Sequence, residues 1–182
     1  MKRILPILML LLSVTSFGQK DSVYPSFTAG VEADVLPFIT GGYYMSVWGG
    51  YKHVRYRVVL AKVISPSFLI PDNFSNNEIE AYAFLVDYFF CRDFRGWWLG
   101  TGLEQWNGQI EAQEGPATGH YTNYLYTVGG GYVWPIYRGL YLNPWAGIHL
   151  RIGGDHSAHV GNLEYTTPFF TPEVSLKVGW HF

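Results

Sequence analysis

Apolar and polar residues alternate with a period of two in the last segment of the chain, residues 172–182. One face of this segment carries Pro172, Val174, Leu176, Val178, Trp180 and Phe182. The other face carries Glu173, Ser175, Lys177, Gly179 and His181. Successive side chains of a β-strand point to opposite faces. The pattern therefore predicts a strand with one apolar face and one polar face.

Seven earlier segments show the same alternation with varying clarity. They are residues 27–35, 43–51, 55–62, 80–88, 97–106, 124–134 and 141–152. Lys62 and Glu80 are exceptions that fall on apolar faces. The total of about eight short segments, with no long apolar run after the first residues, predicts an all-β protein.

The predicted connections between these strands alternate in length. Residues 52–54, 91–96 and 136–139 are short connections, whereas 37–42, 65–77, 107–120 and 153–170 are longer. A membrane barrel whose two ends lie in the periplasm has short periplasmic turns and long outer loops. We therefore predict an eight-stranded antiparallel up-and-down transmembrane β-barrel, with Glu80 at the membrane edge.

The alternation assigns odd-numbered and even-numbered residues of a strand to opposite faces, and we call this assignment parity. Parity alone does not say which face points outward. A secreted eight-stranded barrel with an apolar ligand cavity, similar to a lipocalin, has the same alternation in the opposite orientation. Aromatic residues near the predicted strand ends favour the membrane alternative, because such rings form girdles at both membrane interfaces. They are Tyr43, Tyr51, Tyr56, Tyr88, Trp97, Trp134, Tyr141 and Trp180.

The first 18 residues have the pattern of a secretory signal peptide. Lys2 and Arg3 precede an apolar run over 4–14, and Ser16 and Gly18 supply the small residues of a cleavage site. The run of about eleven residues is too short to span a bilayer as a helix. We therefore predict export, with a signal peptide at 1–18 and a barrel at 19–182.

Composition and charge exclude several classes of protein. The chain is 48% hydrophobic and 14% charged, whereas soluble domains average about 25% charged residues, and it has ample apolar mass against disorder. Its 12 Lys and Arg against 14 Asp and Glu argue against nucleic-acid binding. The single cysteine, Cys91, excludes an internal disulfide and a zinc site of paired thiolates. No cofactor is predicted.

The chain resembles the small eight-stranded outer-membrane proteins of Gram-negative bacteria, the OmpA/OmpX-like class. The leader, the alternating loop lengths and the ending Val178-Gly179-Trp180-His181-Phe182 carry this resemblance. It implies an outer-membrane location among lipid and lipopolysaccharide. It also implies that the barrel-assembly machinery recognises Leu176, Val178, Trp180 and Phe182.

The polar faces of the predicted strands define a charged lumen. An eight-stranded barrel is just wide enough for side chains to fill it, and buried charges must be paired. We therefore expect a plugged, ion-paired interior in which inward glycines make room for Trp48, Trp98 and Trp145. A narrow conducting pore is the alternative. The polar lumen set is Glu32, Asp34, Arg55, Arg57, Asp87, Glu104, His149, Arg151, Glu173 and Lys177.

Candidate chemistry is sparse. The chain also resembles the outer-membrane lipid A deacylases, which carry a His, a Ser two residues later and a Glu early in the last strand. His149 and Glu173 match this pattern, but Arg151 stands where the family has its serine nucleophile. His156 and His159 are candidate metal ligands in a loop, although solvated loop histidines are the commoner explanation of such a pair, and no metal is predicted.

The predicted function is a non-enzymatic outer-membrane barrel with a plugged interior. Its surface loops contain aromatic and rigid residues such as Phe68, Pro71 and Phe169, which suit envelope stabilisation or contact with a ligand. A lipid A-modifying hydrolase and a narrow channel are the alternatives. The sequence does not identify a ligand for the loops.

Overall fold

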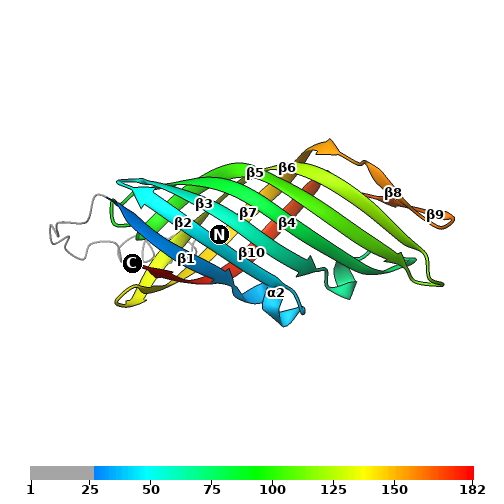
Figure 1. Ribbon diagram of the computed structural model, residues 1–182, viewed down its shortest axis with the longest axis horizontal. Coiled ribbons are helices and arrows are strands. Elements are labelled where there is room, and N and C mark those ends of the chain that lie inside the picture. Colours follow the sequence, from blue (N-terminus) through cyan, green and yellow to red (C-terminus); the bar gives the residue numbers. More distant parts are fainter. Residues whose placement is uncertain (1–26) are drawn as a thin grey trace, which may run out of the picture.

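The computed structural model describes residues 27–182, which form a closed antiparallel barrel (Figure 1). The eight barrel strands are β1 (Thr28–Asp34), β2 (Tyr43–Tyr51), β3 (Val54–Ile64), β4 (Phe74–Phe89), β5 (Gly96–Ala112), β6 (Thr118–Tyr137), β7 (Leu140–Gly154) and β10 (Phe170–His181). Each barrel strand pairs with its neighbour in chain order, and β1 closes the ring against β10. This topology confirms the predicted eight-stranded up-and-down barrel. The predicted signal peptide lies outside the described residues.

The apolar faces of the strands point outward and the polar faces point into the lumen. Met45 and Val174 are 61% and 72% exposed on the outer surface, whereas Asp34, Asp87 and Asn143 have no exposed surface. This is the orientation expected of a membrane barrel, because a water-soluble barrel buries its apolar faces. The lipocalin-like alternative is therefore wrong. Neither helix of residues 27–182 is long and apolar enough to cross a membrane.

The connections are distributed unequally between the two ends of the barrel. The turns at 52–53, 90–95 and 138–139 lie at the end that carries the C-terminus (Figure 1). The opposite end carries a short helix α2 (Val35–Ile39), a 3-10 turn η2 (Ser67–Leu69) and the hairpin of β8 (Ser157–Val160) and β9 (Leu163–Thr166). We call this opposite end, on the right in Figure 1, the upper end, and we use above and below in the same sense along the barrel axis.

All four predicted long loops contain regular structure, and the prediction of irregular loops is wrong above all at 107–120 and 153–170. Loop 37–42 overlaps helix α2, and loop 65–77 contains η2 and the first residues of β4. β5 continues to Ala112 and β6 begins at Thr118, with Ile110 paired to Gly119. Residues 157–166 form the two-stranded sheet of β8 and β9. Helix α2 also begins at Val35, within a predicted strand, where Asp34 caps it by accepting a hydrogen bond from the Leu36 amide at 3.0 Å.

In the parts of β4, β5 and β6 that the sequence did not predict, the outward face is polar and the inward face is apolar, the reverse of the rest of the barrel. Lys62, Glu80, Asn107 and Thr122 are cross-strand neighbours on the outer face of β3 to β6, and we call them the boundary row. Below this row, the outward residues of β4 to β6 are apolar or aromatic except for Gly130, Thr101 and Gln105. Above it the outward residues that pair across the strands are polar, namely Glu78, Gln109, Glu111, Thr118 and His120.

A separate small core lies on the inner side above the boundary row. It consists of Ile110, Ala112, Tyr121, Ala158, Val160 and Tyr165. The β8–β9 hairpin packs on the extended strands through these residues, and Ile110 and Val160 are essentially fully buried. We call the parts of β4 to β6 above the boundary row, together with β8 and β9, the extension. The extension has the polar-outside arrangement of a water-exposed sheet.

Candidate functional site

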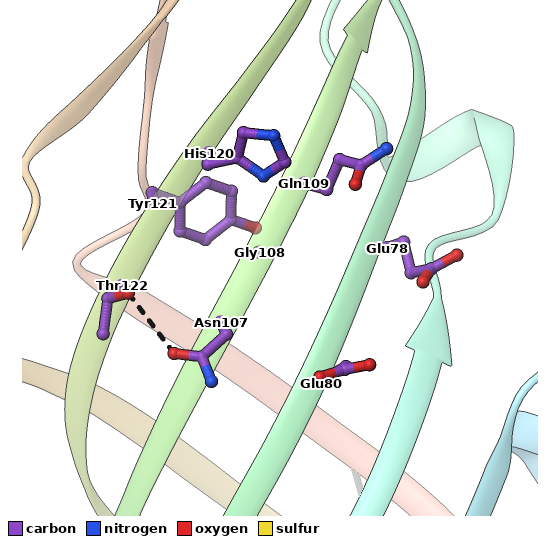
Figure 2. A pocket seen from close by; sticks show the side chains of 8 residues that line it. All are labelled: Glu78, Glu80, Asn107, Gly108, Gln109, His120, Tyr121 and Thr122. Atoms are coloured by element: carbon purple, nitrogen blue, oxygen red, sulfur yellow. Dashed lines mark hydrogen bonds between the residues drawn. The ribbon is translucent and has the colours of Figure 1, made fainter.

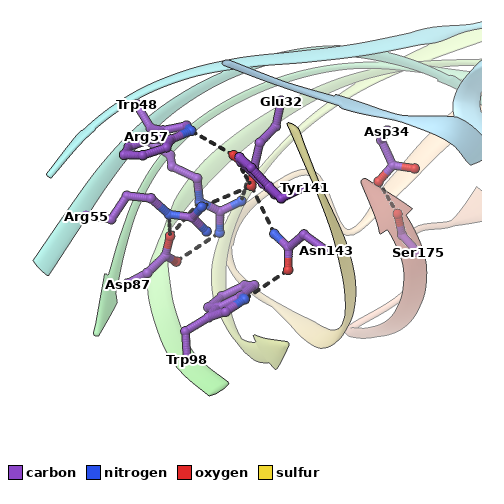
Figure 3. Close-up of polar contacts among 10 residues, drawn as sticks. All are labelled: Glu32, Asp34, Trp48, Arg55, Arg57, Asp87, Trp98, Tyr141, Asn143 and Ser175. Carbon is purple, nitrogen blue, oxygen red and sulfur yellow. Dashed lines mark hydrogen bonds and ion pairs between the residues drawn. The ribbon is translucent and has the colours of Figure 1, made fainter. Parts of the chain in front are cut away.

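A cluster of four charged residues spans the middle of the lumen (Figure 3). Arg57 on β3 makes a two-pronged contact with Asp87 on β4, with Nε–Oδ2 and Nη2–Oδ1 distances of 2.7 and 2.9 Å. Arg55 bridges Asp87 at 2.8 Å and Glu32 of β1 at 2.9 Å. Two guanidinium groups therefore balance two carboxylates in a site that is closed to solvent, as buried charges require.

Neutral side chains extend this cluster across the barrel. Tyr141 and Asn143 on β7 both donate hydrogen bonds to Glu32 Oε1 at 3.0 Å. Trp48 Nε1 donates to the Tyr141 hydroxyl, and Trp98 Nε1 donates to Asn143 Oδ1, each at 2.9 Å (Figure 3). The prediction that Tyr141 belongs to an interfacial girdle is wrong, because its ring lies in the lumen with 3% exposure. The sequence did contain a signal for this inward position, because Tyr141 shares its parity in β7 with the inward-facing Asn143.

Aromatic rings close the lumen below the charged cluster. The Arg55 guanidinium lies 4.8 Å from the Phe89 ring centre and 5.3 Å from that of Trp98, in cation–π geometry. Phe94, from the turn at 90–95, packs against Phe89 and Trp48 with ring centres 5.3 and 5.5 Å apart. The lower end of the barrel is therefore filled by rings rather than open.

Inward glycines make room for these tryptophans, as the sequence predicts. A Cβ on Gly30 would lie 2.6 Å from the Trp48 ring, and a Cβ on Gly131 would lie 2.9 Å from the Trp98 ring. A Cβ on Gly147 would collide with the Trp145 ring. Because real Cβ atoms do not make such close contacts, any side chain at these positions would displace a ring from the lumen.

Lys177 lies above the charged cluster and has a different environment. Its ammonium group is buried, with its Nζ 4.0 Å from the Trp145 ring centre and 4.9 Å from that of Tyr44. Within residues 27–182 this ammonium group forms no direct ion pair with a carboxylate. The neighbouring carboxylate of Asp34 instead accepts a hydrogen bond from the Ser175 hydroxyl (Figure 3).

The two catalytic candidates meet in the upper lumen. His149 Nε2 lies 2.8 Å from Glu173 Oε2, and its Nδ1 lies 2.8 Å from Thr127 Oγ1. The Thr127 hydroxyl donates to Glu104 at 2.9 Å, and Trp106 Nε1 donates to the same carboxylate at 2.8 Å. The arrangement places a hydroxyl, an imidazole and two carboxylates in one hydrogen-bonded chain.

This chain lacks the access that nucleophilic catalysis needs. Thr127 is 3% exposed and His149 is 2% exposed, both facing the lumen. The Thr127 hydroxyl proton is directed at Glu104 rather than at the imidazole, so the imidazole is not placed to act as its base. The geometry is that of a hydrogen-bonded polar network in which the hydroxyl and the imidazole are buried and the Glu173 side chain is 38% exposed at the upper side.

Arg151, His156 and His159 are not joined to the lumen network. The Arg151 side chain donates from Nη1 to the backbone carbonyl of Asp155 at 2.9 Å, at the upper mouth of the barrel. His156 and His159 are exposed at the β8–β9 hairpin, where His159 lies opposite Glu164. Among residues 27–182, no group of three or more His, Cys, Asp or Glu side chains is arranged to hold a metal ion.

The proposed assembly signal lies on the outer surface of the last strand. Leu176, Val178 and Trp180 face outward, each between 37% and 40% exposed. Phe182 follows β10 directly, and its amide donates to the Ala29 carbonyl at 2.9 Å. The C-terminal residue is therefore fastened to the first strand at the seam that closes the barrel.

Comparisons with known proteins support the fold. No protein-family model matches the sequence, and no curated protein is similar to it at a significant level. Among solved structures, Neisserial surface protein A (NspA) superposes with a TM-score of 0.51 at 12% identity, covering 87% of this chain and 98% of that one. A major outer membrane protein from Thermus thermophilus superposes with a TM-score of 0.52 at 12% identity, covering 86% and 98%. The chain shares the fold of these outer-membrane proteins.

Proposed function

We propose that this protein is an integral barrel of the outer membrane of a Gram-negative bacterium, with a sealed lumen, no enzymatic activity and a rigid extension at the cell surface. The inversion of parity at the boundary row is the observation that carries the proposal. The same three strands, β4 to β6, turn apolar side chains outward below this row and polar side chains outward above it.

Such an inversion matches a change of solvent from lipid to water along one continuous strand. An exposed apolar surface of this extent would aggregate in water, whereas in a bilayer it is the solvated surface. Closure of the ring leaves no strand edge unpaired within the lipid. The short turns at one end and the longer connections at the other support placing the turns in the periplasm and the extension outside the cell.

The filled lumen supports a barrel that does not conduct. The ion-paired cluster of Glu32, Arg55, Arg57 and Asp87 crosses its middle, and the rings of Trp98 and neighbouring aromatic residues close it below. Moving an ion through this region would require breaking several buried ion pairs, each costly to separate. A narrow channel is therefore the less favoured function.

The upper lumen gives little support to a lipid A hydrolase. His149 and Glu173 are paired, but Arg151 replaces the required serine, and the only hydroxyl beside the imidazole within the described residues belongs to the buried Thr127. A lipid substrate in the membrane would face the outer wall rather than this network. We propose that the His149–Glu173 pair stabilises the barrel interior.

Envelope stability and surface contacts are the roles that remain. The outer wall would be surrounded by lipid and lipopolysaccharide, and the outward row of Leu176, Val178 and Trp180, with Phe182, would be recognised by the barrel-assembly machinery during insertion. The β8–β9 hairpin, fixed by its own small core, would hold the surface-exposed residues of the extension in one geometry.

Membrane fractionation of the native organism tests the proposal. We expect the protein in the outer-membrane fraction, with heat-modifiable migration in gels because closed barrels resist detergent unfolding. Recovery as a soluble periplasmic protein would contradict it. Planar-bilayer recordings should show no single-channel conductance, and lipid A should have the same acyl pattern with and without the gene.

A further inference from the structure

A shallow polar recess of about 270 Å³ lies on the outer wall of β4 to β6 (Figure 2). Its lining residues are Glu78, Glu80, Asn107, Gly108, Gln109, His120, Tyr121 and Thr122. The Tyr121 ring lies on the inner side, where it donates to Asn77 at 2.8 Å and packs over Gly108. The other side chains share the outer face, so the recess opens away from the lumen.

The recess sits directly above the apolar wall. Its lower edge belongs to the boundary row, with Glu80, Asn107 and Thr122 as cross-strand neighbours. One row further down, Tyr82 and Tyr124 flank Gln105 and are 47% and 49% exposed. Under the membrane placement proposed above, this is the level of lipid headgroups, where exposed tyrosine rings are typical.

The walls of the recess offer both acceptors and donors of hydrogen bonds. Asn107 Oδ1 accepts from Thr122 Oγ1 at 3.3 Å and from Gln105 Nε2 at 3.1 Å, which fixes the amide and leaves its Nδ2 donor free (Figure 2). Gln109 and His120 are cross-strand partners whose side chains make no hydrogen bond within residues 27–182. Carboxylate oxygens of Glu78 and Glu80 complete the set.

The charge of the recess disfavours an anionic ligand. Lys62 is the one cationic side chain beside it in the described chain, and its Nζ is engaged by Glu78 Oε1 at 2.6 Å. A phosphate would therefore meet two carboxylates and no free cation. A metal ion also lacks a set of three ligands within the described residues. Groups that both donate and accept, without charge, fit the walls best.

We propose that this recess binds an uncharged sugar ring in the headgroup of a glycolipid of the outer leaflet. Sugar hydroxyls pair with carboxylates and amides in both directions, and the rings of Tyr82 and Tyr124 supply apolar faces for the sugar beneath. The volume lies just below the roughly 300–1,000 Å³ of drug-sized pockets, which suits a single ring. The acyl chains would then follow the apolar rows of β4 to β6 into the bilayer.

Titration of the full mature barrel in lauryl dimethylamine oxide micelles tests this proposal. Dodecyl maltoside, free maltose and dodecyl phosphate serve as probes, with backbone amide chemical shifts as the readout. We expect dodecyl maltoside to shift the amides of 107–109 and 120–122 in a saturable way. Free maltose should shift the same amides only at higher concentration, and dodecyl phosphate should leave them unchanged.

The double variant Gln109→Ala, His120→Ala removes two outward side chains that make no hydrogen bond within residues 27–182. It should bind dodecyl maltoside about tenfold more weakly, as the loss of two neutral hydrogen bonds predicts. Thr118→Ala is the matched control, since Thr118 lies on the same face of β6 but outside the recess, and it should bind as the parent does.

Three results would overturn the proposal: no localised shifts with either sugar, an equal response in the double variant, or stronger binding of dodecyl phosphate. Binding of maltose as tight as that of dodecyl maltoside would overturn the glycolipid source in favour of a free saccharide. The titration with maltose does not depend on where the protein is located in the cell. A negative result there can therefore be distinguished from a negative result of the membrane fractionation, which tests the proposed function.

Discussion

The lower and upper parts of β5 have opposite distributions of apolar and polar side chains between the outer and inner faces. In residues 97–103 Leu99 and Leu103 face outward, while Trp98 packs inside beside the charged cluster. In residues 107–112 Asn107, Gln109 and Glu111 face outward, while Ile110 is fully buried inside. Under the proposed membrane placement, β5 lies partly in lipid and partly in water. The free-energy cost of a substitution in this strand therefore depends on the height of the position as well as on its face.

The two regions also obtain their stability differently. The lumen below the boundary row depends on buried charges that are stable only as a complete, paired set. The extension depends on an ordinary apolar core, where each buried methyl group contributes through transfer from water and close packing. Substitutions chosen to separate these two sources should therefore have effects of different sizes in the two regions.

The largest effect is expected from Asp87→Asn. This change removes the charge that both Arg55 and Arg57 contact at 2.7–2.9 Å, and leaves the guanidinium groups with one carboxylate between them. Loss of one partner from a buried ion pair costs about 3–5 kcal/mol. Urea unfolding of the barrel in lipid vesicles measures the loss. A change of less than about 1 kcal/mol would mean that the cluster is hydrated rather than closed.

The next effect separates the two heights of the outer wall. Leu103→Arg places a charge on the lipid-facing wall and should cost up to about 2–4 kcal/mol, whereas Gln109→Arg on the same face of β5 should cost about 0–1 kcal/mol. Folding titrations into bilayers compare the two variants. Equal costs would contradict the position of the boundary row.

A smaller effect is expected within the core of the extension. Ile110→Val removes one methylene from a fully buried site and should cost about 0.5–1.5 kcal/mol. Faster hydrogen exchange should appear at the amides of β8 and β9, with the amides of β1 and β10 unchanged. Leu103→Val is the control, because lipid fills the space that it leaves. Faster exchange throughout the barrel would show that the extension and the barrel unfold as one unit.

The smallest effect is expected at the exposed hairpin. Ser157, which is half-buried, donates to the exposed Glu164 across β8 and β9 at 2.5 Å. Ser157→Ala should change the free energy of unfolding by no more than about 0.5 kcal/mol, since exposed substitutions usually stay within that range. A larger loss, measured by the same exchange experiment, would indicate that the hairpin depends on this contact more than on its core.

The alternation rule predicted the barrel well and failed where the solvent changes. It identified all eight barrel strands, because each has an apolar row that faces outward. It missed the upper parts of β4, β5 and β6, since polar residues such as Gln109 and Glu111 on the outer face made those segments resemble loops. The signal was present in the inward Gly108, Ile110 and Ala112, but it has the opposite sense to the rest of the strand.

The sequence predicted which residues belong to the candidate site but not which of them are paired. Parity placed Glu32, Arg57, Asp87 and Glu104 on inward faces without saying which of them pair. The cross-strand register decides which charges pair. Arg55 lies directly opposite Asp87, and the side chain of Arg57, two residues further along β3, extends diagonally to the same carboxylate. The bulge between β6 and β7 lies beside Arg151, which binds the upper loop instead of the lumen.

By itself, the sequence determined the number of barrel strands and the two faces of each, because a period of two follows from the geometry of an extended chain. The tertiary structure decided which face is outside, at which height the outward residues change from apolar to polar and which charges are partners. Those properties depend on how distant strands align across the ring. A local pattern of residues contains the faces of each strand but not the distances between strands.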